Sequence, residues 1–391
     1  MKKTLLLQTA LVAAAGLFVA GAANAQTKEV PVGVTVGGYY QSFYKVQDRD
    51  KTAQVDQSSQ ALGQDAEIWF NIRGVLDNGT IVGGRVELEG TTYSDQIDET
   101  YLFVERADIG RIELGATDRV NAKMNYFSPD PFPGHGTTSQ SEYAASNIQP
   151  QMWTVNHGND NEGINIYTAS NRYFGSKAGK GLQLGLSYVP NGCQDFSGSV
   201  ACGGGFSSTA DAGQLSQQYS AAANYIESFG PVDVALYAGY NSVHIEGTLG
   251  AGATDPRQDA WQVGAQVAYN IGDGSSVTVG GGYNNEDVGR AAGISSSTVT
   301  KERESYTIGI RYLTNGSKPG SVGIGATYYN GEDKNFNSTK DTLDYYALGV
   351  TYQVAKGVLS FAGAGVSDAE LSTTTNDPKQ TFGVVGLRLD F

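Results

Sequence analysis

After residue 26, the chain alternates apolar and polar residues at every second position over long stretches. From Trp261 to Tyr269, every odd position is apolar or aromatic and every even position is small or polar. From Val232 to Asn241 the same alternation holds, apart from Tyr237. Because successive side chains of a β-strand point to opposite faces, this period of two predicts strands with one apolar and one polar face.

Most of the apolar faces carry tyrosine at one or both ends. Two examples are Tyr306, Ile308, Ile310, Tyr312 and Tyr346, Leu348, Val350, Tyr352. A soluble β-sandwich also alternates, but it has no reason to bracket its apolar face with tyrosine. Aromatic girdles at the two interfaces of a membrane supply that reason. The pattern therefore predicts an all-β fold, a transmembrane antiparallel β-barrel.

The alternating segments predict sixteen strands. Their expected ranges are 30–43, 66–75, 80–89, 99–108, 111–116, 162–168, 181–189, 215–226, 231–241, 258–270, 275–284, 302–313, 320–330, 342–353, 357–367 and 380–391. Tight turns such as Asp77-Asn78-Gly79 alternate with long polar connections such as 191–213, and only the turn near 171–180 is extended. Short periplasmic turns and long outer loops are typical of outer-membrane barrels.

The N-terminus predicts secretion. Lys2 and Lys3 precede the apolar run Leu5 to Ala20, and the small-residue pattern Ala23-Asn24-Ala25 follows. This order is typical of a signal peptide, here 1–25, cut before a barrel domain of 26–391. After residue 25 no run of about 18 apolar residues occurs, so the sequence predicts no membrane-spanning helix.

Composition and charge narrow the function. Glycine accounts for 52 of 391 residues, about twice the usual ~7%. Without Lys2 and Lys3, the 26 basic residues become 24 against 40 acidic ones, a net charge of −16. This balance disfavours nucleic-acid binding. The excess acid either solubilises loops or gives the lumen and its mouths an attraction for cations.

One long connection differs from the others. Residues 117–161 lack alternation and contain Ser128-Pro129-Asp130-Pro131-Phe132-Pro133-Gly134. The chain resembles the general diffusion porins in three features: this segment, the position of 117–161 as the third long connection, and the C-terminal strand. In that strand Val385, Leu387, Leu389 and Phe391 share one face. The resemblance implies a third loop folded into the lumen as a constriction, a homotrimer, and Phe391 as an assembly signal for the barrel assembly machinery.

The resemblance also implies a constriction in which acidic loop residues oppose basic wall residues. The alternation places wall candidates in the lumen, where charge avoids the cost of about 2–4 kcal/mol that arginine has on the lipid face. These candidates are Arg73, Arg85, Arg111, Arg388, Glu67 and Glu113. The acidic loop candidates are Asp118, Asp130 and Glu142. Trp69 falls on the lumen side without an explanation from the pattern.

Other chemistry has little support. Cys193 and Cys202, in an outer loop, are expected to form a disulfide, because the periplasm is oxidising and the intervening loop is short. The three histidines accompany no nucleophile motif, and we expect no cofactor, no catalytic residue and no structural metal. Whether divalent cations bind the acidic outer loops stays open.

The sequence thus predicts a bacterial outer-membrane channel for passive diffusion of ions and small hydrophilic solutes, with a preference for cations. Outer-membrane lipid and lipopolysaccharide are its expected surroundings. A substrate-specific porin is the alternative, which saturable block by one solute would identify. A barrel enzyme or an adhesin is a further alternative, which hydrolytic activity or the absence of channel steps would identify.

Overall fold

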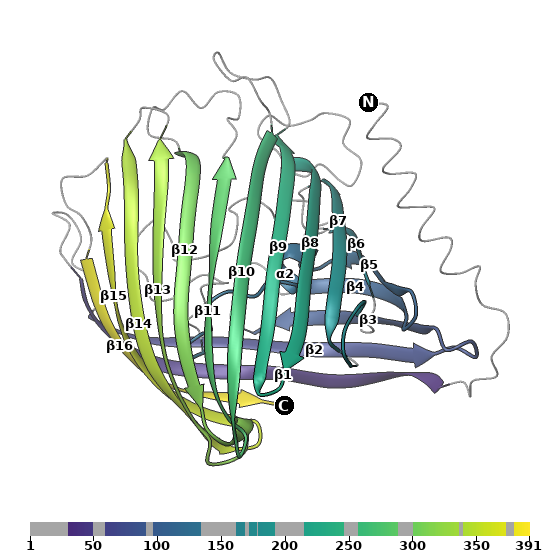
Figure 1. Ribbon diagram of the computed structural model, residues 1–391, viewed down its shortest axis with the longest axis horizontal. Helices are drawn as coiled ribbons and strands as arrows, with labels where there is room; N and C mark the ends of the chain where they lie inside the picture. The colour runs from purple at the N-terminus through teal and green to yellow at the C-terminus, as the bar shows by residue number, and fades with distance from the viewer. Residues whose placement is uncertain are drawn as a thin grey trace.

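The computed structural model is a closed barrel of sixteen antiparallel strands (Figure 1), in which each strand pairs with its neighbours in sequence and β1 pairs with β16. It describes residues 30–49, 59–90, 97–133, 162–168, 172–177, 179–191, 215–245, 257–287, 300–335, 339–372 and 379–391. The strands are β1 (Val30–Arg49), β2 (Gln60–Val75), β3 (Ile81–Glu89), β4 (Ile97–Arg106), β5 (Gly110–Ala116), β6 (Glu162–Tyr167), β7 (Gly181–Asn191), β8 (Leu215–Phe229), β9 (Val232–Ile245), β10 (Arg257–Gly272), β11 (Ser275–Asp287), β12 (Thr300–Leu313), β13 (Val322–Asn335), β14 (Lys340–Ala355), β15 (Val358–Glu370) and β16 (Lys379–Asp390).

All sixteen expected strands are confirmed, and so is the closed antiparallel barrel. Several strands extend further toward the long loops than expected, since β1 continues to Arg49 and β2 begins at Gln60. In these extensions apolar residues such as Val46 and Leu62 stand isolated among polar ones, so the alternation is weaker there. Two short helical turns, α2 (Val120–Lys123) and η2 (Asn315–Ser317), complete the described elements, and no helix in the described ranges is long and apolar enough to cross a membrane.

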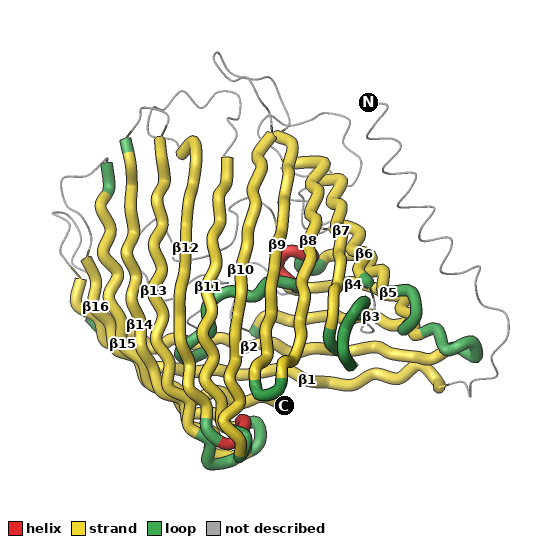
Figure 2. Tube along the Cα trace, viewed as in Figure 1, coloured by secondary structure: helices red, strands yellow, loops and turns green. Residues whose placement is uncertain are grey.

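The tight turns lie together at one end of the barrel, along its lower and right-hand edge in Figure 2, on the same side as the C-terminus. The turn at 76–80 shows why its residues suit it. Gly79 has a φ of +78°, which favours glycine, and the Asn78 side chain accepts a hydrogen bond from the Thr80 amide at 2.9 Å. Because short turns are periplasmic in such barrels, this end faces the periplasm.

The last residue closes the barrel. The Phe391 amide donates to the Gly38 carbonyl at 3.1 Å, and the Gly38 amide donates to the Phe391 carbonyl at 3.0 Å. The terminal strand is thereby joined to β1, which leaves no strand edge unpaired at this point. An assembly role for Phe391 stays a prediction.

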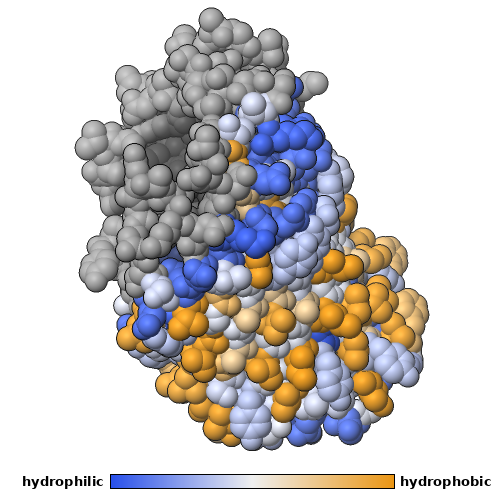
Figure 3. Space-filling model, turned by 90° about the vertical axis from the view of Figure 1, so that its left-hand side faces the viewer, coloured by the Kyte–Doolittle hydropathy of each residue, from blue (hydrophilic) through white to orange (hydrophobic). Residues whose placement is uncertain are grey.

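The outer wall is apolar and exposed, whereas many polar side chains lie buried on the lumen side. Leu62 is 80% exposed and Leu102 is 65% exposed, while Asn241 and Asn284 are fully buried. Figure 3 shows an apolar band on the outer surface beside a hydrophilic zone. This distribution suits a wall that contacts hydrocarbon, with aromatic residues such as Tyr306, Tyr328 and Tyr346 toward its extracellular edge.

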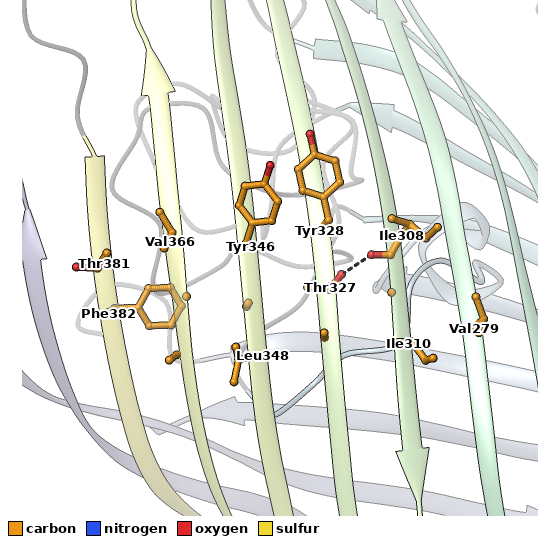
Figure 4. A pocket seen from close by; sticks show the side chains of 15 residues that line it. Val279, Ile308, Ile310, Thr327, Tyr328, Tyr346, Leu348, Val366, Thr381 and Phe382 are labelled. Atoms are coloured by element: carbon orange, nitrogen blue, oxygen red, sulfur yellow. Dashed lines mark hydrogen bonds between the residues drawn. The ribbon is translucent and has the colours of Figure 1, made fainter.

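The outer wall also carries a groove of about 740 Å³ across β11 to β16 (Figure 4). Its lining includes the short side chains of Ala326 and Ala364, which flank Leu348 on the two neighbouring strands. The tyrosine and the large aliphatic residues of its lining belong to the lipid-facing positions of their strands. This groove therefore faces the membrane and not the path of a solute.

Candidate pore constriction

The third long connection begins inside the lumen. The Val120 amide donates to Ser187 Oγ at 2.9 Å, and the carbonyls of Met124 and Phe127 accept from Asn224 and Gln266, each at 2.8 Å. Ser128 and Thr307 share a hydroxyl hydrogen bond of 2.8 Å. These wall partners are lumen-facing and belong to successive parts of the sheet from β7 to β12. Figure 2 shows α2 in red and the loop behind β9, β10 and β11.

Two buried phenylalanines fix this segment in slots made by glycines. Phe127 packs edge-on against Tyr237 at 5.5 Å between ring centroids, and a Cβ added at Gly282 would overlap it. Phe132 stacks on Phe361 at 6.3 Å, and a Cβ added at Gly363 would overlap it. We refer to residues 117–133 as the inward segment. That the rest of 117–161 narrows the lumen stays a prediction, since 134–161 lie outside the described residues.

Glu113 joins the inward segment to the wall. Its carboxylate is 1% exposed and accepts hydrogen bonds from Arg111 at 2.9 Å, Lys123 at 2.8 Å and Tyr167 at 2.6 Å. Arg111 also stacks on the Phe103 ring at 3.7 Å and pairs with Glu105 at 3.3 Å. Because a buried carboxylate needs charged partners to offset its lost hydration, this group fixes Lys123 to β5.

A row of charged and aromatic side chains continues along the wall from β16 to β3. Arg388 stacks on the Tyr39 ring at 3.9 Å, and the Tyr39 hydroxyl donates to Glu67 at 2.8 Å. Trp69 donates to Glu67 at 2.9 Å, and Arg85 lies 4.4 Å above the Trp69 ring. The lumen-facing Trp69 is therefore a platform for Arg85, which explains the exception in the alternation.

The predicted site residues divide into groups. Arg85 contacts Glu99, which accepts from the Asp118 amide at 3.1 Å, so this arginine lies near the inward segment along with Arg111 and Glu113. Arg388 lies toward the periplasmic end and pairs with Asp390 at 2.9 Å. Glu67 belongs to the Tyr39 and Trp69 row.

Arg73 and Asp130, two further candidates, do not belong to the group of Arg85, Arg111 and Glu113. Arg73 is exposed, with no ion pair to any described residue, and Asp130 interacts electrostatically with Arg311. Glu142, Cys193 and Cys202 lie outside the described residues.

Several residues at this site were missed by sequence reasoning. Glu99 and Tyr101 are lumen-facing by the same alternation that selected Arg85 and Glu87, so that signal could have found them. Lys123 was missed because its partner Glu113 lies on a strand and only the fold brings the two together. Arg172 was missed because it lies in a periplasmic connection, where alternation gives no direction.

The inward segment contains a carboxyl group with an altered pKa. Burial raises the pKa of Asp118 to about 6, and the nearby Glu99 and Asp98 add to this effect while Lys123 and Arg119 oppose it. The group is therefore charged at neutral pH and neutral in mild acid. Since its pKa is raised in the folded state, protonation favours docking of the segment, and this contribution is lost as the pH rises through about 6.

We expect the ion selectivity of this lumen to shift toward anions as the pH is lowered from about 7 to about 5, because Asp118 loses its negative charge over that range. Reversal potentials under a salt gradient would measure this. The Asp118→Asn variant should behave at neutral pH as the unmodified chain does in acid, with a smaller pH dependence. An equal pH dependence in both proteins would contradict the assignment to Asp118.

The comparisons with known proteins identify the family. The family model described as Gram-negative porin matches residues 9–371. This chain belongs to the Gram-negative porin family. Its location is accordingly the bacterial outer membrane, as the sequence predicts. No curated protein sequence matches this porin.

Solved porin structures have the same fold. OmpF of Salmonella typhi, in complex with daunomycin, has a TM-score of 0.60 at 14% identity, over 92% of this chain and 97% of that one. The anion-selective porin from Comamonas acidovorans has 0.57 at 15%, over 92% and 100%. OmpT of Vibrio cholerae, in its trimer form, has 0.56 at 13%, over 92% and 99%. At such identities the likeness concerns the fold alone.

Proposed function

We propose that this porin is a water-filled channel for passive diffusion of ions and small hydrophilic solutes, and that it prefers cations. The proposal makes no use of a catalytic residue or a cofactor. The wall side chains and the inward segment limit and orient what passes. The observation that carries the cation preference is the charge of the lumen wall.

Acidic residues outnumber basic ones at the lumen-facing strand positions that the structure describes. The acidic ones are Asp65, Glu67, Glu87, Glu89, Asp98, Glu99, Glu105, Glu113, Asp233, Glu286, Asp333, Asp341 and Asp390, and the basic ones are Lys45, Arg73, Arg85, Arg111, Arg303, Arg311 and Arg388. Carboxylate oxygens of Glu67, Glu89 and Asp98 lie within 4.8 Å of one another. A narrow path lined by excess negative charge concentrates cations.

We expect a reversal potential that shows cation preference when the purified porin separates two concentrations of potassium chloride. The preference should be strong near 0.1 M, where screening acts over about 10 Å, and weak near 1 M, where it acts over about 3 Å. Anion preference at low salt would contradict the proposal. Arg85→Gln should strengthen cation preference, whereas Lys340→Gln, at an exposed outer rim position, should leave it unchanged.

A substrate-specific porin is a second candidate, favoured by the row from Arg388 through Tyr39 and Trp69 to Arg85. Alternating charged groups and aromatic faces along one wall could hold a solute at successive positions. Saturable reduction of single-channel current by one class of solute, reduced in a Trp69→Ala variant, would support that function. Block that does not saturate would favour general diffusion.

The other expectations remain proposals for this chain. We infer a homotrimer, in keeping with the trimer form of the OmpT structure, within outer-membrane lipid and lipopolysaccharide. Delivery would use the signal peptide 1–25 and the barrel assembly machinery, with Phe391 as the assembly signal of the barrel 26–391. The disulfide between Cys193 and Cys202 and the constriction role of 117–161 are proposed on the sequence.

A further inference from the structure

The extended periplasmic connection between β6 and β7 sends an arginine into the lumen. Arg172 Nη1 donates to the Gly181 carbonyl at 3.2 Å and to Asn224 Oδ1, and Nη2 donates to Gln183 Oε1 at 3.1 Å. Asn224 is the same residue that donates to the Met124 carbonyl of the inward segment. The Arg172 guanidinium therefore lies directly on the periplasmic side of that segment.

The charge of Arg172 is not neutralised locally. Its hydrogen-bond partners are neutral oxygens, and it forms no ion pair with any carboxylate in the described ranges. By contrast, Arg111 and Arg388 each pair with a carboxylate within 3.3 Å. The guanidinium of Arg172 therefore adds a positive charge at this level of the lumen.

Arg311 adds a second positive charge on the periplasmic side of the inward segment. It is a lumen-facing residue near the periplasmic end of β12, beside Gly323 and Thr351 of the neighbouring strands. Its only electrostatic partner in the described part of the chain is Asp130 of the inward segment, with which it forms no ion pair within 4 Å. Arg73, near the periplasmic end of β2, is exposed and has no ion-pair partner there either.

The lumen charges separate along the barrel axis. The described lumen-facing charges nearer the extracellular ends of their strands are Asp65, Glu67, Glu87, Glu89, Asp98, Glu99, Glu286, Asp333 and Asp341, with Lys45 and Arg303. Arg85 and Glu113 lie at the midpoints of β3 and β5 and carry opposite charges. Those nearer the periplasmic ends, with the β6–β7 connection included, are Arg73, Arg111, Arg172, Lys180, Arg311 and Arg388, with Glu105, Asp233 and Asp390. The extracellular half is thus acidic and the periplasmic half is basic.

We propose that these two zones in series make the channel rectify ionic current. This inference rests on the proposed channel function and goes beyond its overall cation preference. When the extracellular side is positive, cations enter through the acidic zone and anions enter through the basic zone, so both accumulate in the pore. When the polarity is reversed, each zone excludes the ion that is driven toward it, and the pore is depleted. Conductance is therefore larger with the extracellular side positive.

The test records current through the full mature porin, inserted in a planar bilayer from one side, at equal voltages of opposite sign. Near 0.1 M potassium chloride the two conductances should differ, and near 1 M, where screening shortens to about 3 Å, they should converge. Arg172→Gln and Arg311→Gln should each reduce the asymmetry, and the double variant should reduce it further. Lys340→Gln, a charge change on the outer rim, should leave the asymmetry unchanged.

The outcomes separate this inference from the proposed function. Channel steps of equal size at both polarities in low salt would overturn rectification and leave the channel function intact. Absence of channel steps would overturn the channel function itself. An asymmetry that survives in the double arginine variant, or that persists unchanged at high salt, would also overturn the assignment to these two zones. Arg172 lies in the β6–β7 connection and Arg311 lies in β12, so a folding failure of one single variant leaves the other as a test.

Discussion

Replacing both Phe127 and Phe132 by alanine should release the inward segment and enlarge the single-channel conductance. Both rings are 2% exposed, and loss of a buried phenylalanine costs about 3–5 kcal/mol. The hydrogen bonds that remain between the segment and the wall contribute only about 0.5–1.5 kcal/mol each. Two such losses together cost about 6–10 kcal/mol. They leave the part of the segment beyond the Lys123–Glu113 anchor held to the wall mainly by the hydrogen bonds of Met124, Phe127 and Ser128. Single-channel conductance measured near 1 M salt, where charge effects are screened, would report the change in the width of the pore.

Controls for this prediction come from the same slots. Phe132→Leu keeps an apolar side chain in place and should change conductance little, whereas Gly363→Val fills the slot from the wall side and should act like the loss of the ring. Gly383→Val, a glycine of β16 whose added Cβ would come no closer than 3.3 Å to Val46, controls for glycine replacement in a strand. Unchanged conductance in the double alanine variant would show that these rings do not hold the segment.

The strands were predictable because alternation is a local property. Each residue's face follows from its neighbours two positions away, and so the lumen-facing positions of Glu67, Arg85, Arg111 and Glu113 follow without knowledge of the fold. The extension of β1 to Arg49 was missed because apolar residues become sparse toward the long loops. The alternation therefore predicts the centres of the strands more accurately than their ends.

The path of the inward segment was not predictable from the sequence, although the glycines that receive its phenylalanines can be recognised once the fold is known. Gly282, Gly349 and Gly363 occupy lumen-facing positions in separate strands, and each would collide with a phenylalanine of the segment if it carried a Cβ. In the sequence they resemble ordinary strand glycines. Only the pairing of strands, which brings distant positions to one level, shows that they form slots.

The partners of Glu113 illustrate the same limit. Tyr167 and Lys123 reach this carboxylate through a strand pairing and through the return of the segment into the lumen, respectively. Sequence reasoning gave Glu113 a role in lining the pore. The structure shows that its carboxylate is buried beneath its partners. Its main effect is therefore to hold the side chains of Arg111 and Lys123 in place.

Glu113→Gln should therefore destabilise the folded barrel strongly. Removing one partner of a buried ion pair leaves uncompensated charge and costs about 3–5 kcal/mol. Arg111 would keep Glu105 and the Phe103 ring, and Lys123 would keep the Thr117 hydroxyl at 2.7 Å and a contact with the Tyr101 ring. Unfolding in detergent micelles should then occur at a lower temperature or denaturant concentration. The reversal potential should also move toward anion preference, since two cations near the segment lose their carboxylate.

The matched control is Glu105→Gln, which removes another carboxylate partner of Arg111. Glu105 is half-buried, and a pair of this kind contributes about 0–1 kcal/mol, so its loss should lower the free energy of unfolding only slightly. Adding Lys123→Gln to Glu113→Gln should restore part of the lost stability, because the unpaired cation is then removed as well. If Glu113→Gln and Glu105→Gln lowered the free energy of unfolding equally, Glu113 would not be a buried anchor. If adding Lys123→Gln restored no stability, the destabilisation would come from the unpaired Arg111 and not from the inward segment. In either case the unfolding of the single and double variants distinguishes a residue that lines the pore from one that holds the segment against the wall.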